Sequence, residues 1–290
     1  MQFTNNIDNK KKNEINAGLY VVSTPIGNLD DLSFRALEVL KKSDYILCEN
    51  TKRSSKLLNH YNLKKKLIAY HKFNEKSMLD RVVNLAKKNK IISLISDAGT
   101  PTISDPGLLL IKKCIIENLK IIPIPGPSSV TSAVSVSGFD DKYIFYGFLP
   151  KKENEIKKII KSLCILDYSI VFFVPAQRIN FFLKFSKIFF SNRMILIAKE
   201  MTKIYEELIR DSVSSIGEFS TNFKGELTVV LSKPKQEKKR MNELSESVKQ
   251  DIKRMIKKYT VKDVVDFFSK KENLPKKSIY NFCLKLKDLK

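Results

Sequence analysis

The chain has 290 residues, of which 43% are apolar, 10% aromatic and 29% charged, a composition typical of a globular protein. It excludes a collagen-like or low-complexity chain, and its length predicts two domains, or one large domain with an appendage. Lys and Arg (53) outnumber Asp and Glu (31), so the formal net charge is +22. This excess favours a polyanionic partner, with nucleic acid ahead of an anionic membrane surface.

The cysteines are far apart in the sequence, without a C-x-x-C pair or clustered His, so we expect no metal site and a reducing compartment. Residues 1–16 lack the apolar segment of a secretory signal, and their polar composition predicts a disordered tail. The long uncharged stretch 121–139 contains Pro-Gly-Pro and many Ser residues, which argues against a membrane helix. We therefore expect a soluble, cytoplasmic protein that does not bind a membrane.

Residues 17–140 alternate between short apolar runs and helix-like segments, which predicts a first α/β domain with a mostly parallel sheet. The predicted strands are LYVVS, YILCE, LIAY, IISLIS and KIIPI. Helices are predicted between them, over LSFRALEVLKK, a basic segment ending at His60, EKSMLDRVVNLAKK, LLLIKKCII and the small residues after Pro127. The apolar runs are continuous, as in strands that are covered on both faces.

Residues 141–233 repeat this alternation and predict a second α/β domain. The pattern gives a basic helix near 153–165, a strand at SIVFFV, a helix from Gln177, and strands at MILIAK and ELTVVLSK. Residues 234–290 begin with the linker-like PKQEKKR and continue into two short amphipathic helices around a Leu-Pro turn, in the manner of a helix-turn-helix. This basic region either contacts RNA or DNA or forms a solvated cap on the second domain.

Three turns rich in Gly, Pro, Ser and Thr directly follow predicted strands: STPIGN (23–28), SDAGTP (96–101) and PIPGPSS (123–129). In open α/β sheets the carboxyl ends of the strands form the ligand crevice, where Gly lets the backbone approach a ligand. Each turn alone also has a structural explanation, since tight turns need Gly and Pro. Together they predict a ligand site, in which Asp97 accepts hydrogen bonds from a ribose or an amino group; its alternative role is to cap a helix.

Several common catalytic motifs are absent from the sequence. It contains no G-x-G-x-x-G fingerprint, no phosphate-binding G-x-x-x-x-G-K-[ST] loop and no H-E-x-x-H motif. Its two histidines, His60 and His71, are not near a nucleophile elbow, which disfavours a Ser-His-Asp hydrolase. These absences favour an enzyme that transfers a group mainly by holding its reactants in position.

In combination, GLYVVSTPIGN, SDAGTPTISDPG, PIPGPSS and YGFLP resemble the tetrapyrrole-methylase family, the class III S-adenosylmethionine methyltransferases. YGFLP, the E-x-T-K-x-x-E run at 200–206 and the C-terminal helices are similar to one subgroup of that family. That subgroup methylates the 2'-oxygen of a cytidine ribose in 16S rRNA of the small ribosomal subunit. The resemblance extends from about Gly18 to the C-terminus.

The resemblance implies two α/β domains with S-adenosylmethionine in the cleft between them, and a homodimer. A sulfonium cofactor needs no metal, and methyl transfer depends on holding the ribose oxygen near the methyl carbon. The chain differs from the family pattern at Asn50, which replaces a carboxylate, and at Val174 and Gln177, which replace a glutamate and a histidine. The cofactor contacts that the resemblance implies are Pro25, Gly27, Asp97, Gly99, Thr100, Ser129, Val130, Leu227 and Thr228.

For catalysis, our hypothesis is that Glu49 or Glu200 assists deprotonation of the ribose hydroxyl and that the Lys199 cation stabilises the developing alkoxide. The alternative role of Glu49 is to cap or pair at the sheet edge. The residues expected to hold the RNA backbone are Lys52, Arg53, Arg178 and Lys203, although each lysine can equally be a solvated surface residue.

Two other classes of function stay open at this stage. A methylase of a small tetrapyrrole would use the same cofactor site, but it would not require the +22 charge or the basic C-terminal region. A non-catalytic RNA-binding protein of ribosome assembly would explain Asn50, Val174 and Gln177, but it would not require all three turns.

Overall fold

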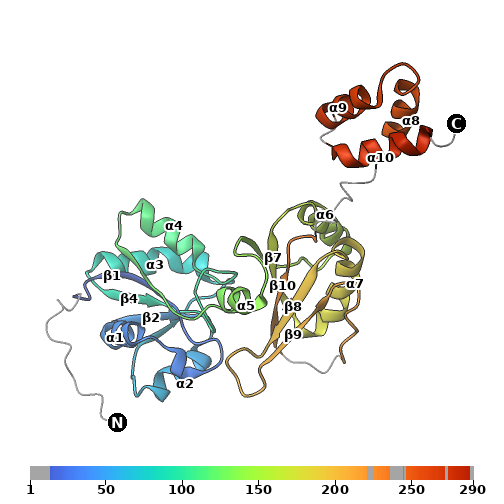
Figure 1. The fold of residues 1–290 in the computed structure, drawn as a ribbon. Coiled ribbons are helices and arrows are strands. Elements are labelled where there is room, and N and C mark those ends of the chain that lie inside the picture. Colours follow the sequence, from blue (N-terminus) through green and yellow to red (C-terminus); the bar gives the residue numbers. More distant parts are fainter. Residues whose placement is uncertain (1–13, 221–224, 236–243, 245, 272–273, 288–290) are drawn as a thin grey trace, which may run out of the picture. The chain divides into compact units, whose positions relative to one another are not determined.

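The computed structural model describes residues 14–220, 225–235, 244, 246–271 and 274–287 (Figure 1). The chain divides into two compact units, the α/β unit (1–234) and the C-terminal unit (235–290). The predicted tail, 1–16, lies largely outside the described residues. The finer division at 17–140, 141–233 and 234–290 stays a prediction.

The first sheet of the α/β unit is entirely parallel, as predicted. Its strand order is β3-β2-β4-β1-β5. All five strands coincide with predicted apolar runs: β1 (Gly18–Val22), β2 (Tyr45–Cys48), β3 (Leu67–Ala69), β4 (Ile91–Leu94) and β5 (Ile121–Ile124). Because the strands are parallel, their carboxyl ends and the turns that follow them lie at one edge.

Helices cover both faces of this sheet, which explains the continuous apolar runs. Successive strand residues belong to different cores: Tyr20 and Val22 pack with α1 and α2, whereas Leu19 packs with α3 and α4. A short 3-10 helix η1 (Leu29–Asp31) precedes α1. The helices are α1 (Phe34–Lys42), α2 (Thr51–His60), α3 (Glu75–Lys87), α4 (Leu108–Ile116) and α5 (Ser129–Ser137).

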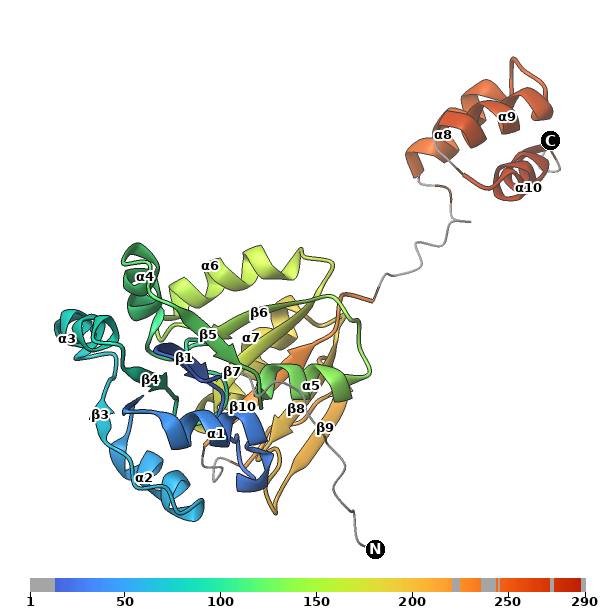
Figure 2. The same ribbon diagram turned by 90° about the vertical axis from the view of Figure 1, so that its left-hand side faces the viewer.

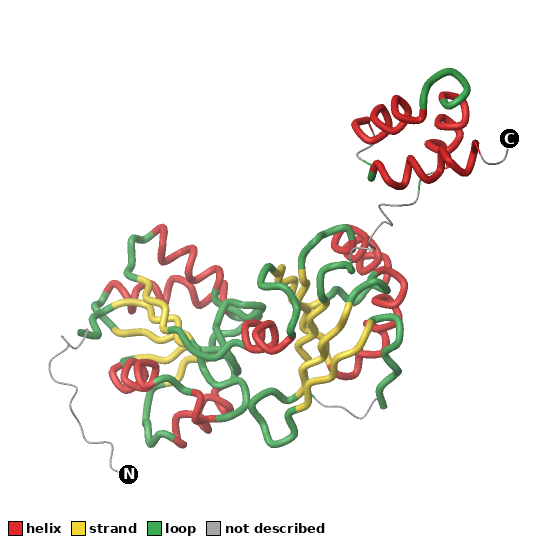
Figure 3. The backbone as a smooth tube through the Cα atoms, in the orientation of Figure 1, coloured by secondary structure: helices red, strands yellow, loops and turns green. Residues whose placement is uncertain are grey.

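The second sheet is mixed, with strand order β6-β7-β10-β8-β9 (yellow strands, Figure 3). Only β6 and β7 run parallel to each other; β10 is antiparallel to both β7 and β8, and β9 is antiparallel to β8. The strands are β6 (Tyr143–Phe148), β7 (Ser169–Pro175), β8 (Met194–Lys199), β9 (Glu207–Ser212) and β10 (Glu226–Leu231).

The sequence did not predict β6 or β9. In β6 the pairing register shifts between Phe145 and Gly147, so the strand lacks a regular pattern. In β9 half of the residues of ELIRDS are charged, as is common for an edge strand, and pairing with β8 makes it a strand.

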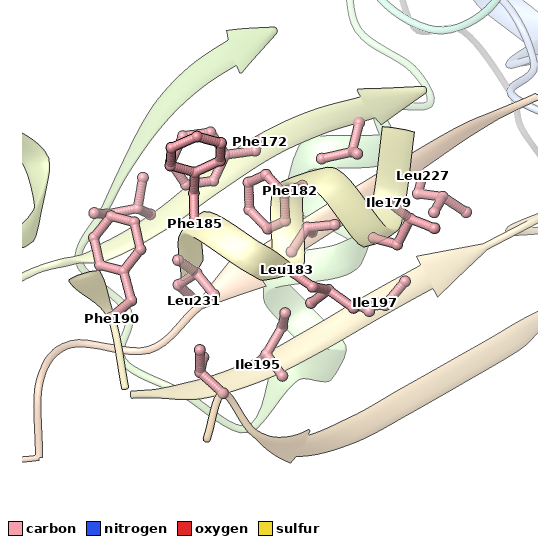
Figure 4. Packing of buried hydrophobic residues seen from close by; sticks show 14 of the residues in the cluster. Phe172, Ile179, Phe182, Leu183, Phe185, Phe190, Ile195, Ile197, Leu227 and Leu231 are labelled. Atoms are coloured by element: carbon pink, nitrogen blue, oxygen red, sulfur yellow. The ribbon is translucent and has the colours of Figure 1, made fainter. Parts of the chain in front are cut away.

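One face of the second sheet is covered by α6 (Glu153–Cys164), the 3-10 helix η2 (Ala176–Arg178) and α7 (Ile179–Phe189). Phe172 of β7 packs against Phe182 of α7, with ring centroids 5.3 Å apart (Figure 4). Phe182, Phe185 and Phe190 are buried in this core. The helical spacing of phenylalanines in α7 therefore reflects core packing.

The helix α5 packs on the other face of the second sheet, although it follows the last strand of the first sheet. It lies beside β8 and β10 in Figures 1 and 2. Its Val130 and Ala133 share a core with Val171, Leu196 and Val230 of the second sheet. The small residues of SVTSAVSVS let the helix approach the strands closely, so the ligand-facing turn before α5 lies next to the second sheet.

A buried arginine connects residues 164–168 to the segment that follows β10. Arg193 is only 1% exposed, and its guanidinium donates hydrogen bonds to four carbonyl oxygens. The acceptors are Cys164, Leu166, Tyr168 and Ser232, at 2.7–3.1 Å. Each carbonyl thus gains a charge-assisted partner in place of water.

The C-terminal unit contains three helices, α8 (Glu246–Met255), α9 (Val261–Lys271) and α10 (Lys276–Lys287). They enclose a core of their own around Ile252, Val264, Phe268, Ile279 and Cys283. The last two helices occupy the segment predicted as a helix-turn-helix. In the described part of the chain, no helix is long and apolar enough to cross a membrane.

Candidate active site

A cavity of about 690 Å³ lies where the carboxyl ends of β1, β2, β4 and β5 meet the second sheet. This volume is within the range of 300–1,000 Å³ that is typical of sites for small molecules. From the first sheet, the three predicted turns contribute Ile26, residues 97–100 and residues 128–130. From the second sheet come Phe173 and Pro175 of β7, Ala198 at the end of β8 and Thr228 of β10.

Hydrogen bonds connect the three turns to one another. The backbone N–H of Thr24 donates to the carbonyl of Gly99 at 2.9 Å, and the N–H of Gly99 donates back to Thr24 at 3.0 Å. The hydroxyl of Thr100 lies 2.9 Å from that of Ser23 and donates to the carbonyl of Pro127 at 3.1 Å. The three turns, far apart in the sequence, therefore form one connected wall of the cavity.

The first turn also contacts the loop between β8 and β9. A Cβ atom on Gly27 would lie 2.6 Å from the Thr202 hydroxyl and 2.7 Å from the Met201 carbonyl, so only glycine fits. The N–H of Asn28 donates to the Thr202 hydroxyl at 2.9 Å. Thr202 has φ +64° and Glu200 has φ +50°, conformations that are uncommon for residues other than Gly and concentrate at functional sites.

Asp97 is held by the start of α2. Its carboxylate accepts a hydrogen bond from the N–H of Asn50 and pairs with the guanidinium of Arg53, each at 3.2 Å. The side chain of Asn50 caps α2 by accepting from the N–H groups of Lys52 and Arg53. An amide at position 50 thus performs the cap that a carboxylate would also perform, and the departure from the family pattern leaves this part of the site intact.

The third turn leads into α5 without a side-chain cap at Ser128. Ser128, Ser129 and Val130 all line the cavity. The first N–H groups of a helix have no partner within the helix and attract negative charge and hydrogen-bond acceptors. This end of the cavity is thus suited to a carboxylate or a ring nitrogen.

Five carboxyl groups line the cavity. Glu200 is paired with Lys203; the other four, here called the acidic wall, are Glu49, Asp97, Asp105 and Glu226. Burial, followed by the negative charge of Glu49, raises the pKa of Asp105 to about 7. Burial also raises the pKa of Glu226, against the opposing effect of Arg53. The pKa of Glu49 is raised by burial and then by Asp97, while His71 and Arg53 act in the opposite direction. An acidic cavity inside a protein of net charge +22 is suited to a cationic ligand.

Two members of the acidic wall, Asp105 and Glu226, were not predicted from the sequence. Asp105 belongs to a second Ser-Asp pair in SDAGTPTISDPG, but it does not directly follow a strand. Glu226 precedes the apolar run of β10 and has no motif of its own. The sequence signal that could have identified Asp105 was thus the second Ser-Asp pair. In the described residues, no group of three or more His, Cys, Asp or Glu side chains could hold a metal ion.

The structure brings most of the predicted site residues to the cavity. Glu49 and Glu200 of the catalytic set and Arg53 and Lys203 of the RNA set line it, and Lys203 pairs with Glu200 at 2.9 Å. The predicted cofactor residues that line it are Asp97, Gly99, Thr100, Ser129, Val130 and Thr228.

The other predicted residues lie outside the cavity lining. Leu227 is buried in the core of the second sheet, and Lys199 pairs with Glu207 at 3.1 Å. Arg178 donates to the carbonyl of Pro150 and lies over the ring of Phe181. Pro25 and Gly27 shape the first turn, and Lys52 lies at the exposed start of α2.

The other two departures from the family pattern have different surroundings. Val174 is buried in the core of the second sheet, and the neighbouring Phe173 faces the cavity instead. Gln177 lines the cavity. Only at position 177, therefore, does the changed residue lie directly at the candidate site.

Residues 18–217 match the sequence profile of the tetrapyrrole (corrin/porphyrin) methylases. The chain belongs to this family. Among solved structures, the tetrapyrrole-methylase fold is shared with diphthine synthase (TM-score 0.60, 13% identity, 74% of this chain and 89% of that one). Uroporphyrin-III-C-methyltransferase from Thermus thermophilus has a TM-score of 0.54 at 13% identity, over 74% of this chain and 94% of that one. At these identities the structures show the fold alone.

Curated relatives in this family carry the name ribosomal RNA small subunit methyltransferase I. The Thermotoga maritima relative is 43% identical over 217 residues, which are 74% of this chain and 97% of the relative. The Rickettsia prowazekii relative is 37% identical over 266 residues, 89% of this chain and 95% of the relative. The whole Thermotoga maritima relative thus has about the size of the α/β unit. The Rickettsia prowazekii relative aligns with more residues than the α/β unit contains.

Proposed function

We propose that this tetrapyrrole methylase transfers a methyl group from S-adenosylmethionine to the 2'-oxygen of a cytidine ribose in 16S rRNA of the small ribosomal subunit. The observation that carries the proposal is the match, over almost the whole length of both chains, to relatives named ribosomal RNA small subunit methyltransferase I. The net charge of +22 supports an RNA acceptor, since a small tetrapyrrole requires no such charge.

The cavity fits S-adenosylmethionine in size and in charge. Its acidic wall faces the positive sulfonium and ammonium groups that this cofactor carries. The uncapped N–H groups at the start of α5 suit the cofactor's carboxylate or its adenine nitrogens. When bound, S-adenosylmethionine supplies an electrophilic methyl group. The residues proposed to hold it are Asp97, Gly99, Thr100, Ser129, Val130 and Thr228.

The 2'-hydroxyl of ribose must lose its proton when its oxygen gains the methyl group. We assign this proton to the carboxylate of Asp105, because a general base works best when its pKa is near the working pH. Burial and the neighbouring Glu49 give Asp105 a pKa of about 7. The sequence-based hypothesis gave this role to Glu49 or Glu200; here we propose that Glu49 is a positioning residue that raises the pKa of Asp105.

The RNA is proposed to approach along the rim that carries Lys52, Arg53 and Lys203. Arg53 and Lys203 line the cavity and are paired with Asp97 and Glu200 respectively. We expect these cations, each held by a carboxylate, to contact the phosphates of a bound strand. Contacts to phosphates position the strand, while the hydroxyl itself distinguishes RNA from DNA.

A second copy of the chain is the further partner that we propose, acting with the first in the cytoplasm where small subunits assemble. Supporting this, α4 exposes Leu108, Ile115 and Ile116, an apolar edge on the α/β unit. Light scattering of the full chain tests the dimer: a mass near 67 kDa, twice the 33.4 kDa of one chain, is expected, and a monomer mass contradicts it.

The function is tested by transfer of labelled methyl from S-adenosylmethionine to small subunits that lack the modification. Deproteinised 16S rRNA and a tetrapyrrole precursor serve as parallel acceptors. We expect label in rRNA, recovered in alkali-resistant dinucleotides because a methylated 2'-oxygen blocks alkaline cleavage. Label confined to the tetrapyrrole, or no transfer to any acceptor despite cofactor binding, contradicts the proposal.

A further inference from the structure

The C-terminal unit has a core that is independent of the α/β unit. The side chains of Ile252, Val264, Phe268, Ile279 and Cys283 are at most 1% exposed and pack with one another. These residues come from all three helices, and they lie on the inner face of each. The outer faces are therefore not needed to hold the helices together.

Basic residues are concentrated in this unit. Residues 235–290 contain 17 Lys and Arg against eight Asp and Glu, a net charge of +9 in 56 residues. Residues 1–234 contain 36 against 23, a net charge of +13. The charge per residue is roughly threefold higher in the C-terminal unit, which is the electrostatic pattern of a surface that binds nucleic acid.

The outer face of α10 carries a continuous set of residues, here called the basic stripe: Lys277, Tyr280, Asn281, Leu284 and Lys285. Their spacing of three and four residues places them on one side of the helix. Tyr280 is 48% exposed and Leu284 is 38% exposed, so an aromatic and an apolar side chain face the solvent between two lysines. The sequence of α10 contains no acidic residue.

The two lysines of the basic stripe differ from their neighbour Lys276. Lys276 pairs with Asp266 of α9 at 2.7 Å. Within the described residues, neither Lys277 nor Lys285 has an ion-pair partner. Eight residues of helix separate them by about 12 Å, and Tyr280 lies between. Two cations that flank an exposed ring match the pattern with which proteins hold single-stranded nucleic acid.

We propose that the basic stripe of α10 binds the rRNA substrate, with Lys277 and Lys285 on the phosphate backbone and Tyr280 stacked on a base. The proposal rests on the proposed function, because it takes the rRNA as its ligand. The shorter Thermotoga maritima relative, no larger than the α/β unit, supports a role in binding rather than in methyl transfer. The C-terminal unit thus adds affinity to a catalytic unit that is complete without it.

The test compares two doubly substituted full-length chains in their affinity for 16S rRNA at several salt concentrations. Lys277→Gln with Lys285→Gln removes the proposed contacts, and Lys253→Gln with Lys257→Gln removes the same charge outside α10. We expect the first pair to weaken binding about tenfold and to reduce the slope of log affinity against log salt by about 2, or about 1 for each phosphate contact. We expect the control to change affinity by less than about twofold.

Tyr280 provides a second, independent variant. Stacking predicts that Tyr280→Ala weakens RNA binding about tenfold whereas Tyr280→Phe, which keeps the ring, binds as the wild type does. Thermal unfolding of each variant verifies that the helices remain folded. Equal loss of binding in both lysine pairs, or equal affinity of Tyr280→Ala and Tyr280→Phe, overturns the proposal.

The partner and the proposed function are tested separately. Tighter binding of a DNA strand of the same sequence, or of vesicles with anionic lipid, through Lys277 and Lys285 would overturn the assignment to RNA. If the wild type transfers no methyl group to rRNA but loses RNA affinity with the α10 substitutions alone, the methyl-transfer function fails and the binding proposal stands.

Discussion

The cavity of the α/β unit and the outer face of α10 carry opposite charge. The acidic wall brings Glu49, Asp97, Asp105 and Glu226 together in a partly buried space. The basic stripe presents Lys277 and Lys285 at the surface of a helix with no acidic residue. A net charge of +22 therefore describes neither region. Local charge shows what each can hold: a small cation in the cavity and a polyanion on the helix.

The difference in burial between the two regions matters as much as the difference in sign. Burial in the cavity raises the pKa of Asp105 to about 7. A carboxyl group with such a pKa can take up and release a proton at neutral pH. The exposed lysines of the basic stripe act through salt-dependent attraction to phosphates. We therefore expect substitutions in the cavity to change the rate of transfer, and substitutions in the basic stripe to change RNA affinity.

The largest expected effect is on the rate of methyl transfer. Asp105→Asn keeps the size of the side chain but removes the proton acceptor, and we expect a loss of about 10²- to 10³-fold in the single-turnover rate with saturating cofactor and subunits. Glu155→Gln, an exposed residue of α6, is the control and should retain the wild-type rate. A rate for Asp105→Asn within about threefold of the wild type removes Asp105 from the mechanism.

A smaller effect is expected on cofactor affinity. Asp97→Ala removes the carboxylate that we propose as a hydrogen-bond acceptor for the cofactor; the same carboxylate pairs with Arg53, which also lines the cavity. Charge-assisted hydrogen bonds of this kind contribute about 1.5–3 kcal/mol, so we expect affinity for S-adenosylmethionine to fall at least tenfold in titration calorimetry. Asp80→Ala on α3 is the control. Equal affinities of the two variants would show that Asp97 only stabilises the start of α2 and does not contact the cofactor.

The smallest expected effect is on the pH dependence of stability. The folded state holds the proton of Asp105 up to about pH 7, well above the ordinary carboxyl range, so this group stabilises the fold at low pH. That contribution is lost as the pH rises from about 4 through about 7. We therefore compare the free energy of unfolding in urea of Asp105→Asn with that of the wild type at two pH values. The variant should be more favourable relative to the wild type at about pH 8 than at about pH 5. If the difference in unfolding free energy between the two proteins is the same at both pH values, the raised pKa of Asp105 is contradicted.

The parallel sheet and its ligand edge could be predicted from sequence because both follow from local patterns. Continuous apolar runs mark doubly covered strands, and Gly, Pro and Ser mark the turns that end them, as β1, β4 and β5 show. The strand β9 could not be predicted, since only its pairing with β8 makes the charged segment ELIRDS a strand.

The acidic wall was predicted only in part, for a related reason. Glu49 lies at the end of one apolar run predicted as a strand and Asp97 directly follows another, whereas Asp105 and Glu226 reach the cavity through tertiary packing that the sequence does not display. Leu227 shows the converse, because it lies beside Thr228 in the sequence but faces the core. Alternation along a strand decides such cases, and it places adjacent residues on opposite faces.

The most direct test of the account is the pH dependence of kcat/KM for methyl transfer to small subunits, measured for the wild type and for Glu49→Gln. This quantity reports the pKa of the base in the free enzyme. We expect the wild-type value to rise with pH and to level off above about pH 7. Removing the charge of Glu49 should lower the pKa of Asp105 and move the rise to lower pH. A wild-type profile that is flat from about pH 6 to about pH 8, or a Glu49→Gln profile with an unchanged midpoint, would contradict it.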